Sequence, residues 1–359
     1  MEKTKMILVG GFLGAGKTSM MRSAAEVLKK QGNRVGLITN DQASNLVDTS
    51  YLAGEGNIVT EVSGSCFCCN FPGFAQAFEK TAQMINGGIT IAEPVGSCTD
   101  LSATIVQPIK DKYADQVDLA PLTVMADPRR LKFILDQKKA TANYIMTKQF
   151  DEADIILINK IDLLSADELK DLVSRTKENF TNAKVMTCSV KEGTGVKDWL
   201  DYIMSVQVTG QNLAEVDYDL YGAGEAAYGW MNATYQFASD GEDFADKADK
   251  LLNALASAFE EERVAVGHVK FLLNSKAHQW MGNITIDAAT ATLVDEDCSS
   301  EESSLTVNAR AEIKPGQLQK IVLGIMDDLF DQYEITGTNV RCLIPGYPNP
   351  TYHYNKVVK

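Results

Sequence analysis

A glycine-rich loop that contains one lysine and one threonine is the first feature of this chain that could do chemistry. It follows the apolar run at residues 6–9 and precedes residues that favour a helix. Glycines let backbone N–H groups curl around phosphate oxygens, Lys17 can reach the β- and γ-phosphates, and the Thr18 hydroxyl can ligate Mg²⁺. The order of strand, loop and helix favours a phosphate-binding loop over a glycine-rich turn that binds nothing. The expected contacts are Gly11, Gly14, Ala15, Gly16, Lys17, Thr18 and Ser19.

A second motif predicts which base is bound. Asn159-Lys160-Ile161-Asp162 follows the apolar run at 155–158, and Ser189-Val190-Lys191 follows another at 184–188. The Asp162 carboxylate can accept hydrogen bonds from N1–H and from the exocyclic amine of guanine, and adenine offers no matching donors. We therefore expect GTP rather than ATP, with Ser189, Val190 and Lys191 in the loop that packs on the base.

Three thiols stand within four positions, in Ser65-Cys66-Phe67-Cys68-Cys69-Asn70. In an extended segment residues i and i+2 point the same way, so Cys66 and Cys68 can chelate one ion. Cys69 then has to join through a turn or serve another role. Thiolates select Zn²⁺ and other soft or borderline metals, and a closed structural zinc site has four protein ligands. Three local donors leave one position open, which suits an ion that is handed on.

Other interpretations of the thiols compete with a metal site. They are a redox pair, buried cysteines that act as small hydrophobic residues, and an iron–sulfur ligand set that lacks its fourth member. We favour metal because cysteine clusters this dense mostly bind metal in reducing compartments. Cys98, after the strand end at 91–97, is a candidate fourth ligand, and a merely packed thiol explains it equally well.

Bulk composition limits the choice of partners and compartment. Acidic residues number 48 against 34 basic ones, and the net charge of −14 opposes binding to a phosphate backbone. No uncharged apolar run reaches the length of about 18 residues that a membrane span needs. The chain has seven cysteines, an odd number that fits free thiols better than a disulfide framework. We therefore expect a cytoplasmic protein that binds neither nucleic acid nor membrane.

The first part of the chain alternates apolar runs with helical patterns. Strands are expected at 6–9, 34–39, 89–92, 121–126, 155–158 and 184–188. This alternation predicts an α/β domain at 1–207 with a mostly parallel sheet, and ligands of such sheets lie beyond the carboxyl ends of the strands. Residues 208–226 lose periodicity and are expected to be a linker.

Residues 227–359 have a different pattern. Strands are expected at 228–237, 266–273, 280–286, 305–313 and 340–344, and helices at 242–262 and 316–333, with an exposed acidic loop at 295–304. This order predicts a smaller α+β domain in which two helices cover one face of an antiparallel sheet.

The order of four motifs along the chain resembles that of the CobW-like metallochaperone GTPases, which are relatives of UreG and HypB. The motifs are the phosphate loop, Cys66-x-Cys68-Cys69, Glu93-Pro94-Val95-Gly96 and Asn159-Lys160-x-Asp162. The resemblance implies a GTPase whose hydrolysis is coupled to loading a metal, or a metal-containing cofactor, into a client. Lys17 would then be catalytic. Asp41 would belong to the first switch and Glu93 to the second, and both would act with Thr18 near Mg²⁺ and the attacking water. The cysteines would hold the delivered divalent ion, with Zn²⁺ or Co²⁺ expected.

Some features depart from that family pattern. The three histidines His268, His278 and His353 are widely separated, so the chain has no histidine-rich stretch for bulk metal storage, and Cys98 is not a general family feature. The motifs contain no obvious arginine finger or catalytic glutamine, which predicts slow basal turnover that metal, client or self-association accelerates. A GTP-dependent homodimer is a further expectation.

Two rival functions remain open at this point. One is a GTP-dependent gatekeeper of a cobalamin or corrinoid enzyme, in which the thiols bind no free metal. The other is a redox-sensing switch in which Cys66 and Cys68 form a disulfide.

Overall fold

The computed structural model describes residues 3–41, 47–53, 57–137, 143–206, 208–239, 243–275, 278–285, 289–295 and 303–359. The chain divides into two units, neither of which is continuous in sequence. The first unit is Met1–Gln42, Glu55–Gly224 and Tyr347–Lys359, and the second is Ala43–Gly54 and Glu225–Gly346.

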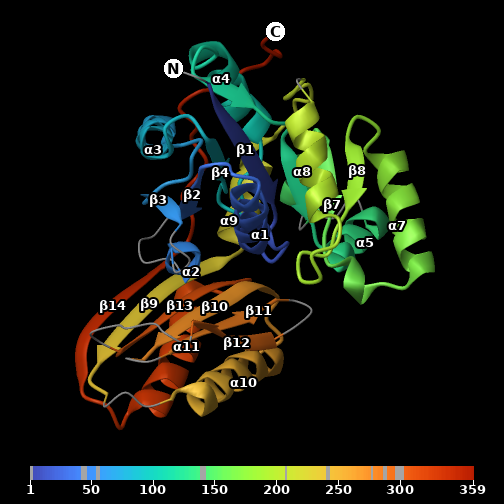
Figure 1. Cartoon of the computed structure of the whole chain (residues 1–359). Coiled ribbons are helices and arrows are strands. Elements are labelled where there is room, and N and C mark those ends of the chain that lie inside the picture. The colour runs from blue at the N-terminus through green and yellow to red at the C-terminus, as the bar shows by residue number, and fades with distance from the viewer. Residues whose placement is uncertain are drawn as a thin grey trace. The chain divides into compact units, whose positions relative to one another are not determined.

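A parallel sheet forms the centre of the first unit (Figure 1). Its order is β3-β2-β4-β1-β6-β7-β8, with β5 also paired to β1, and every pairing is parallel. The central strands are buried on both faces, which explains their continuous apolar runs. The strands are β1 (Thr4–Gly11), β2 (Val35–Asp41), β3 (Ile58–Ser63), β4 (Ile89–Ala92), β5 (Val117–Leu119), β6 (Thr123–Ala126), β7 (Ile155–Ile158) and β8 (Lys184–Thr187).

Helices cover both faces of this sheet. Helix α1 (Lys17–Lys30) connects β1 to β2, whereas α3 (Phe71–Ile85) connects β3 to β4 in the opposite direction across the sheet. Right-handed crossovers that run in opposite directions lie on opposite faces. The remaining helices of the first unit are α4 (Gln107–Lys112), α5 (Pro128–Asp136), α6 (Tyr144–Asp151), α7 (Ala166–Asn179) and α8 (Val196–Ser205), with a π-helical turn at Ser102–Val106 and a 3-10 turn at Ile161–Leu163.

Local capping signals explain where several helices begin. The Asn70 side chain accepts a hydrogen bond from the Gly73 amide at the start of α3, and Asp127 accepts from two amides at the start of α5. Ser165 and Glu168 form a capping box at the start of α7. Each cap satisfies amide groups that have no partner inside the helix, which fixes the point at which the chain turns into it.

An antiparallel sheet with the order β12-β11-β10-β13-β9-β14 forms the second unit. Helices α10 (Ala245–Glu261) and α11 (Pro315–Phe330) lie side by side on one face (Figure 1) and share an apolar core with it. The short helix α2 (Val47–Ala53) also belongs here. The strands are β9 (Gly229–Phe237), β10 (Val266–Asn274), β11 (Gln279–Ile284), β12 (Ala289–Asp295), β13 (Ser303–Ala311) and β14 (Ile335–Leu343).

These features confirm the predicted fold class, a parallel α/β domain followed by a smaller antiparallel one. The elements that were not predicted include the strands β3, β5 and β12, the helix α2 and the helix α9 (Tyr218–Ala226), which lies in the segment expected to be a linker. Strand β3 is an edge strand with a single buried position, so it lacks the apolar run by which the other strands were found. None of the helices in the described part of the chain has the length and apolar composition needed to cross a membrane.

The division of the chain also differs from the boundaries expected at 207 and 226. Helix α2 groups with the second unit because the Val47 amide donates to Asn308 Oδ1 and Lys270 pairs with Asp48 at 2.6 Å. The segment Tyr347–Lys359 groups with the first unit, where Thr351 donates a hydrogen bond to the Cys68 carbonyl. Both associations are long-range, so local periodicity gave no sign of them.

Candidate functional site

The phosphate-binding loop lies between the end of β1 at Gly11 and the start of α1 at Lys17. Gly16 has a φ of 95°, and a side chain at Gly11, where φ is 128°, would lie 2.4 Å from the Met125 carbonyl oxygen. Both positions therefore require glycine. Lys17 and Thr18 are buried at the first turn of the helix, and Ser19 is exposed beside them. The loop thus leads directly into a helix N-terminus, where anions are favoured.

Glu93, directly after β4, contacts the Lys17 ammonium and the Thr18 hydroxyl in the first turn of α1. Thr18 Oγ1 donates to Glu93 Oε2 at 3.0 Å, and Lys17 Nζ lies 3.5 Å from Glu93 Oε1. A hydroxyl and a carboxylate are hard oxygen donors of the kind that Mg²⁺ prefers, so the residues present fit this ion. Asp41 is the last residue of β2, but its side chain lies outside the described residues.

Asn159 joins the two nucleotide motifs. Its Nδ2 donates to the Ala15 carbonyl at 3.0 Å, and its Oδ1 accepts from the Val190 amide at 3.1 Å. A side chain at Gly16 would come within 2.4 Å of Asn159 Nδ2, so the phosphate loop and the second motif are in direct contact. Asn159 is buried, and its contacts fix the position of one motif relative to the other.

The remaining residues of the second motif are held by neighbouring loops. Lys160 has a φ of 57°, and its ammonium lies 2.6 Å from Oδ2 of Asp127, a carboxylate that is only 1% exposed. Asp162 is exposed, and its Oδ1 accepts a hydrogen bond of 2.6 Å from Ser189 Oγ. This orients the Asp162 carboxylate at the surface, beside the half-buried Val190 and the exposed Lys191.

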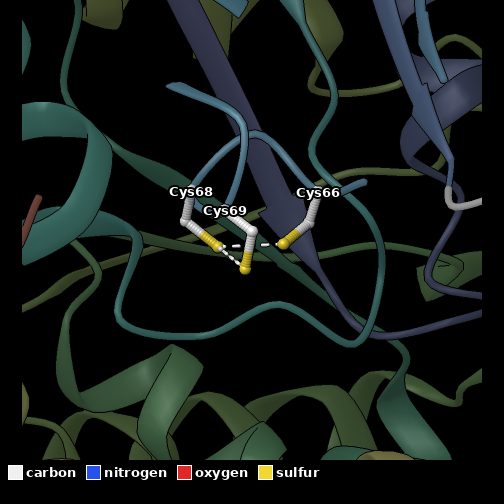
Figure 2. Close-up of side chains that lie close together, drawn as sticks. All are labelled: Cys66, Cys68 and Cys69. Carbon is white, nitrogen blue, oxygen red and sulfur yellow. Dashed lines mark hydrogen bonds between the residues drawn. The ribbon is translucent and has the colours of Figure 1, made fainter. Parts of the chain in front are cut away.

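The three clustered thiols follow β3 in the turn that leads into α3. Figure 2 shows the sulfur atoms of Cys66, Cys68 and Cys69 pointing toward one another. The Sγ atoms of Cys66 and Cys68 are 3.1 Å apart, those of Cys68 and Cys69 are 3.9 Å apart, and all three lie within 4.8 Å of one another. Cys66 and Cys68 are buried and Cys69 is half-buried. This is the one group of three or more metal-ligating side chains found among the described residues.

Hydrogen bonds among the thiols shift their pKa values in different directions. The pKa of Cys66 is lowered, chiefly because Cys68 donates to its thiolate, and Cys69 and Cys98 contribute in the same sense. The pKa of Cys68 is raised by the same bond, with burial adding to it, and the bond with Cys66 raises the pKa of Cys69 to about 11. The cluster therefore favours one thiolate that its neighbours stabilise, and a bound cation would replace their protons.

Cys98 is buried, and it contributes to lowering the pKa of Cys66 and raising that of Cys68, but it is not among the three thiols that lie within 4.8 Å of one another. It lies in the loop after Glu93. The amide of Gln149 donates to the carbonyls of Gly96 and Cys98 at 3.0 and 2.7 Å. A side chain at Gly96 would lie 2.9 Å from Lys17 Nζ, so this loop contacts the phosphate site at one end and carries Cys98 at the other.

Asn40 ties the cysteine turn to the end of β2. Its Nδ2 donates to the carbonyls of Val62 and Ser65, both at 2.8 Å, and its Oδ1 accepts from the Phe67 amide at 2.9 Å. The Asn40 side chain is buried, so these bonds are protected from water. The backbone that carries Cys66 is thus fixed by the residue adjacent to Asp41.

Two buried carboxyl groups support the segment after Cys98. Asp100 has a φ of 66°, and its Oδ2 accepts from Tyr218 Oη at 2.7 Å and lies 3.0 Å from His353 Nε2. Glu152 accepts from Thr99 Oγ1 at 3.2 Å and from the Ser102 amide at 2.7 Å. Burial raises the pKa of Asp100 and of Glu152.

Sequence reasoning missed several of these residues. Asp127 carried a signal, because an Asp-Pro pair directly after an apolar strand is typical of a helix start. Asn40 adjoins the predicted Asp41, and Asp100 lies two residues after the predicted Cys98, but neither has a motif of its own. The contribution of the C-terminal segment 347–359 had no local signal at all.

Comparison with known proteins places these motifs in one family. Residues 5–187 match the family model described as CobW/HypB/UreG, nucleotide-binding domain. Two curated relatives are zinc chaperones. The zinc chaperone CobW of Sinorhizobium sp. is 25% identical over 207 residues, covering 50% of this chain and 58% of the relative. The zinc chaperone YeiR of Escherichia coli strain K12 is 29% identical over 163 residues, covering 44% of this chain and 47% of the relative.

The chain spans about half the length of these curated relatives. Among solved structures, the Zn(II)-bound YjiA GTPase from E. coli is similar over 92% of this chain and 99% of that one, with 15% identity and a TM-score of 0.38.

Proposed function

Because the chain belongs to the CobW/HypB/UreG family of nucleotide-binding domains, we propose that it is a GTP-hydrolysing metallochaperone. It binds a divalent transition metal through Cys66, Cys68 and Cys69 and delivers the metal to a client protein. The observation that carries this proposal is the thiol cluster, which lies in the same unit as the nucleotide motifs and is connected to them through Asn40 and the Glu93–Cys98 loop.

The proposed nucleotide is GTP, held by the phosphate loop and read by Asp162. Lys17 would neutralise the phosphates, and Thr18, Glu93 and Asp41 would supply oxygen ligands for Mg²⁺, which would supply positive charge to screen phosphoryl transfer. The Ser189 hydroxyl holds one oxygen of the Asp162 carboxylate, and this contact sets the carboxylate's direction toward the base. We expect GTP hydrolysis to be slow until a metal, a client or self-association accelerates it. Self-association would take the form of a GTP-dependent homodimer.

The proposed cargo is Zn²⁺ or Co²⁺, bound by soft thiolate ligands. Two relatives are named as zinc chaperones, which favours zinc. Cys98 remains the candidate fourth ligand because its thiol is buried in the loop that follows Glu93, and it would have to approach the three clustered thiols when the metal binds. With Cys98 engaged the site is closed, and without it one position remains open for a ligand of the client.

Energetics limit how nucleotide can control such a site. Thiolate-rich zinc sites are worth about 10–16 kcal/mol, whereas allosteric coupling is typically about 1–3 kcal/mol. The nucleotide state therefore cannot expel the ion by itself. Transfer requires an accepting ligand set on the client, and hydrolysis lowers the barrier by loosening the cysteine turn through Asn40 and the Cys98 loop.

Metal titration in defined nucleotide states tests the proposal. Zn²⁺ affinity is measured by competition with a chelator under reducing conditions, for nucleotide-free, GDP-bound and GTP-analogue-bound protein. We expect the affinity to rise about 5- to 150-fold with the GTP analogue and to disappear in the C66S/C68S/C69S variant. Equal affinities in all three states would contradict coupled delivery.

One observation favours a second candidate, a thiol redox switch. The sulfur atoms of Cys66 and Cys68 are 3.1 Å apart, close enough for a disulfide after a small adjustment. A reversible disulfide in a chain that binds no metal would support this switch. If the triple serine variant still activates a cobalamin-dependent client, the chain is instead a gatekeeper whose thiols are not needed for its activity.

A further inference from the structure

The C-terminal segment 347–359 has no regular secondary structure, yet it crosses the thiol cluster. The Thr351 amide donates to the Cys68 carbonyl at 2.8 Å, and Thr351 Oγ1 donates to the Cys69 carbonyl at 3.2 Å. The Asn349 amide donates to the sulfur of Cys69 at 3.3 Å. This segment therefore contacts both the backbone of the cysteine turn and one of its sulfur atoms.

The same segment is anchored on both sides of these contacts. Before them, Tyr347 Oη donates to Asp219 at 3.1 Å. After them, the Tyr352 ring packs edge-on against the Phe71 ring, with their centroids 5.1 Å apart. Further along, the backbone amide of Val358 donates to Gln107 Oε1 at 2.8 Å. Figure 1 shows this stretch returning to the first unit and ending near α4. The segment is held at both ends like a strap.

Local sequence fixes the shape of the strap where it meets the sulfur. Pro348 and Pro350 flank Asn349, and each proline fixes its own φ and confines the preceding residue to extended conformations. The Asn349 side chain is exposed, so its backbone N–H is the group that reaches the cluster. Because the chain is already extended here, little conformational entropy is lost in holding that N–H against Cys69.

Cys69 is also the thiol that most needs such support. It is half-buried, whereas Cys66 and Cys68 are buried, so competing ligands reach the cluster most easily at Cys69. An N–H group that points at a ligating sulfur restricts its rotation and stabilises the negative charge it carries when bound to a metal. Hydrogen bonds to the ligand's own carbonyl further restrict the turn.

We propose that segment 347–359 is an outer strap of the metal site, in which the Asn349 amide positions the Cys69 sulfur and slows exchange of the bound metal. The inference rests on the proposed metal-binding function. Asn349 and Thr351 are positioning residues, because neither would touch the metal. Release to a client then requires the strap to lift from Cys69.

A pair of substitutions at one position tests the strap. N349P removes the amide hydrogen at a position that Pro350 already restricts to extended conformations, and N349A keeps the hydrogen while removing the same exposed side chain. With Co²⁺ as the probe, thiolate-to-metal absorption gives affinity and ligand number, and transfer to a chelator gives the exchange rate. We expect N349P to bind about 10- to 100-fold more weakly and to release metal correspondingly faster, with N349A close to wild type. Equal values for the two variants would overturn the proposal.

Two further measurements keep the test sharp if N349P proves difficult to fold. T351V removes the hydroxyl bond to the Cys69 carbonyl, and we expect faster metal release with unchanged GTP affinity. In metal-free protein, alkylation of Cys69 followed by mass spectrometry should be faster after deletion of 347–359, and an unchanged rate counts against the strap. If wild type binds no metal, the proposed function fails. If wild type binds metal and the N349P and N349A variants behave alike, only the strap fails.

Discussion

The phosphate loop and the cysteine turn both lie at the carboxyl ends of parallel strands in one sheet, but they are held by different kinds of contact. The phosphate loop is fixed by its own glycine dihedrals and by the buried Asn159. The cysteine turn is fixed by Asn40 from the neighbouring strand and by Thr351 from the C-terminal segment. A loop whose shape is set largely by its own backbone dihedrals is expected to stay formed, whereas a turn whose shape depends on contacts from other segments can loosen while the sheet stays intact.

The two asparagines make the same comparison at the level of one residue. Each is buried and uses both ends of its amide, but Asn159 joins two parts of the nucleotide site, and Asn40 joins the end of β2 to the thiols. Removing the first amide should therefore damage one site. Removing the second should weaken the thiol site and uncouple it from the nucleotide site, which itself stays intact.

The largest expected effect is at Asp162. D162A removes the two charge-assisted hydrogen bonds proposed to guanine, each worth about 1.5–3 kcal/mol, so GTP affinity should fall about 10²- to 10⁴-fold. Calorimetric titration with GTP measures this loss. The metal affinity of the nucleotide-free variant should equal that of wild type.

D167A is the matched control, because Asp167 is an exposed acid at the start of the neighbouring helix α7. GTP affinity should be nearly unchanged in this variant. A D162A protein that still binds GTP as tightly as D167A would exclude Asp162 as the guanine-reading residue.

An intermediate effect is expected at Asn40. N40A leaves the Phe67 amide and two carbonyls of the cysteine turn without their partner, so metal affinity should fall about tenfold and GTP should no longer raise it. GTP affinity itself should change less than about threefold, since binding energies of distant groups are roughly additive. Zn²⁺ competition with and without a GTP analogue measures both quantities.

N33A provides the comparison for a general loss of stability, because the Asn33 side chain donates one hydrogen bond to the Leu28 carbonyl at the end of α1, which its backbone amide also contacts. Nucleotide dependence of metal binding should survive in N33A. If it also survives in N40A, the coupling does not pass through this amide.

The smallest effect is expected at Glu152, which supports the segment after Cys98. Burial raises its pKa, so the folded chain binds more protons than the unfolded chain above the ordinary pKa of glutamic acid. The contribution of Glu152 to the free energy of unfolding should therefore be most favourable in acid and should fall as pH rises toward the raised pKa. E152Q removes this loss and should gain about 1 kcal/mol at pH 8 but little at pH 4.5, measured by urea unfolding.

The effect of E168Q on stability should have the opposite sign and the opposite pH dependence from that of E152Q. The pKa of the exposed Glu168 is lowered by its hydrogen bonds with Ser165, so its charge stabilises the chain above its ordinary pKa and this contribution disappears in acid. A gain in E152Q that is the same at both pH values would show that burial of the charge is not the cause.

Much of the fold could be predicted because the information is local. The six expected strands of the first sheet are present as β1, β2, β4, β6, β7 and β8, since strands buried on both faces need continuous apolar runs. The edge strand β3 escaped prediction because a strand with one neighbour needs few buried residues, and β3 has a single buried position. The boundaries of the two units escaped it because α2 and the C-terminal segment each join a unit that is distant along the chain.

The amino-acid sequence by itself determined the residue types at each site: glycines where φ is positive, an aspartate spaced to read guanine, and three thiols that must lie close because they are nearly adjacent. Spacing along the chain suffices for groups that belong to one turn. Only the tertiary structure decided that Asn40 fixes the cysteine turn and that Asn349 lies against Cys69. Such contacts join residues whose separation in sequence gives no information about distance, since it is the crossing of strands and the return of the chain end that bring them together.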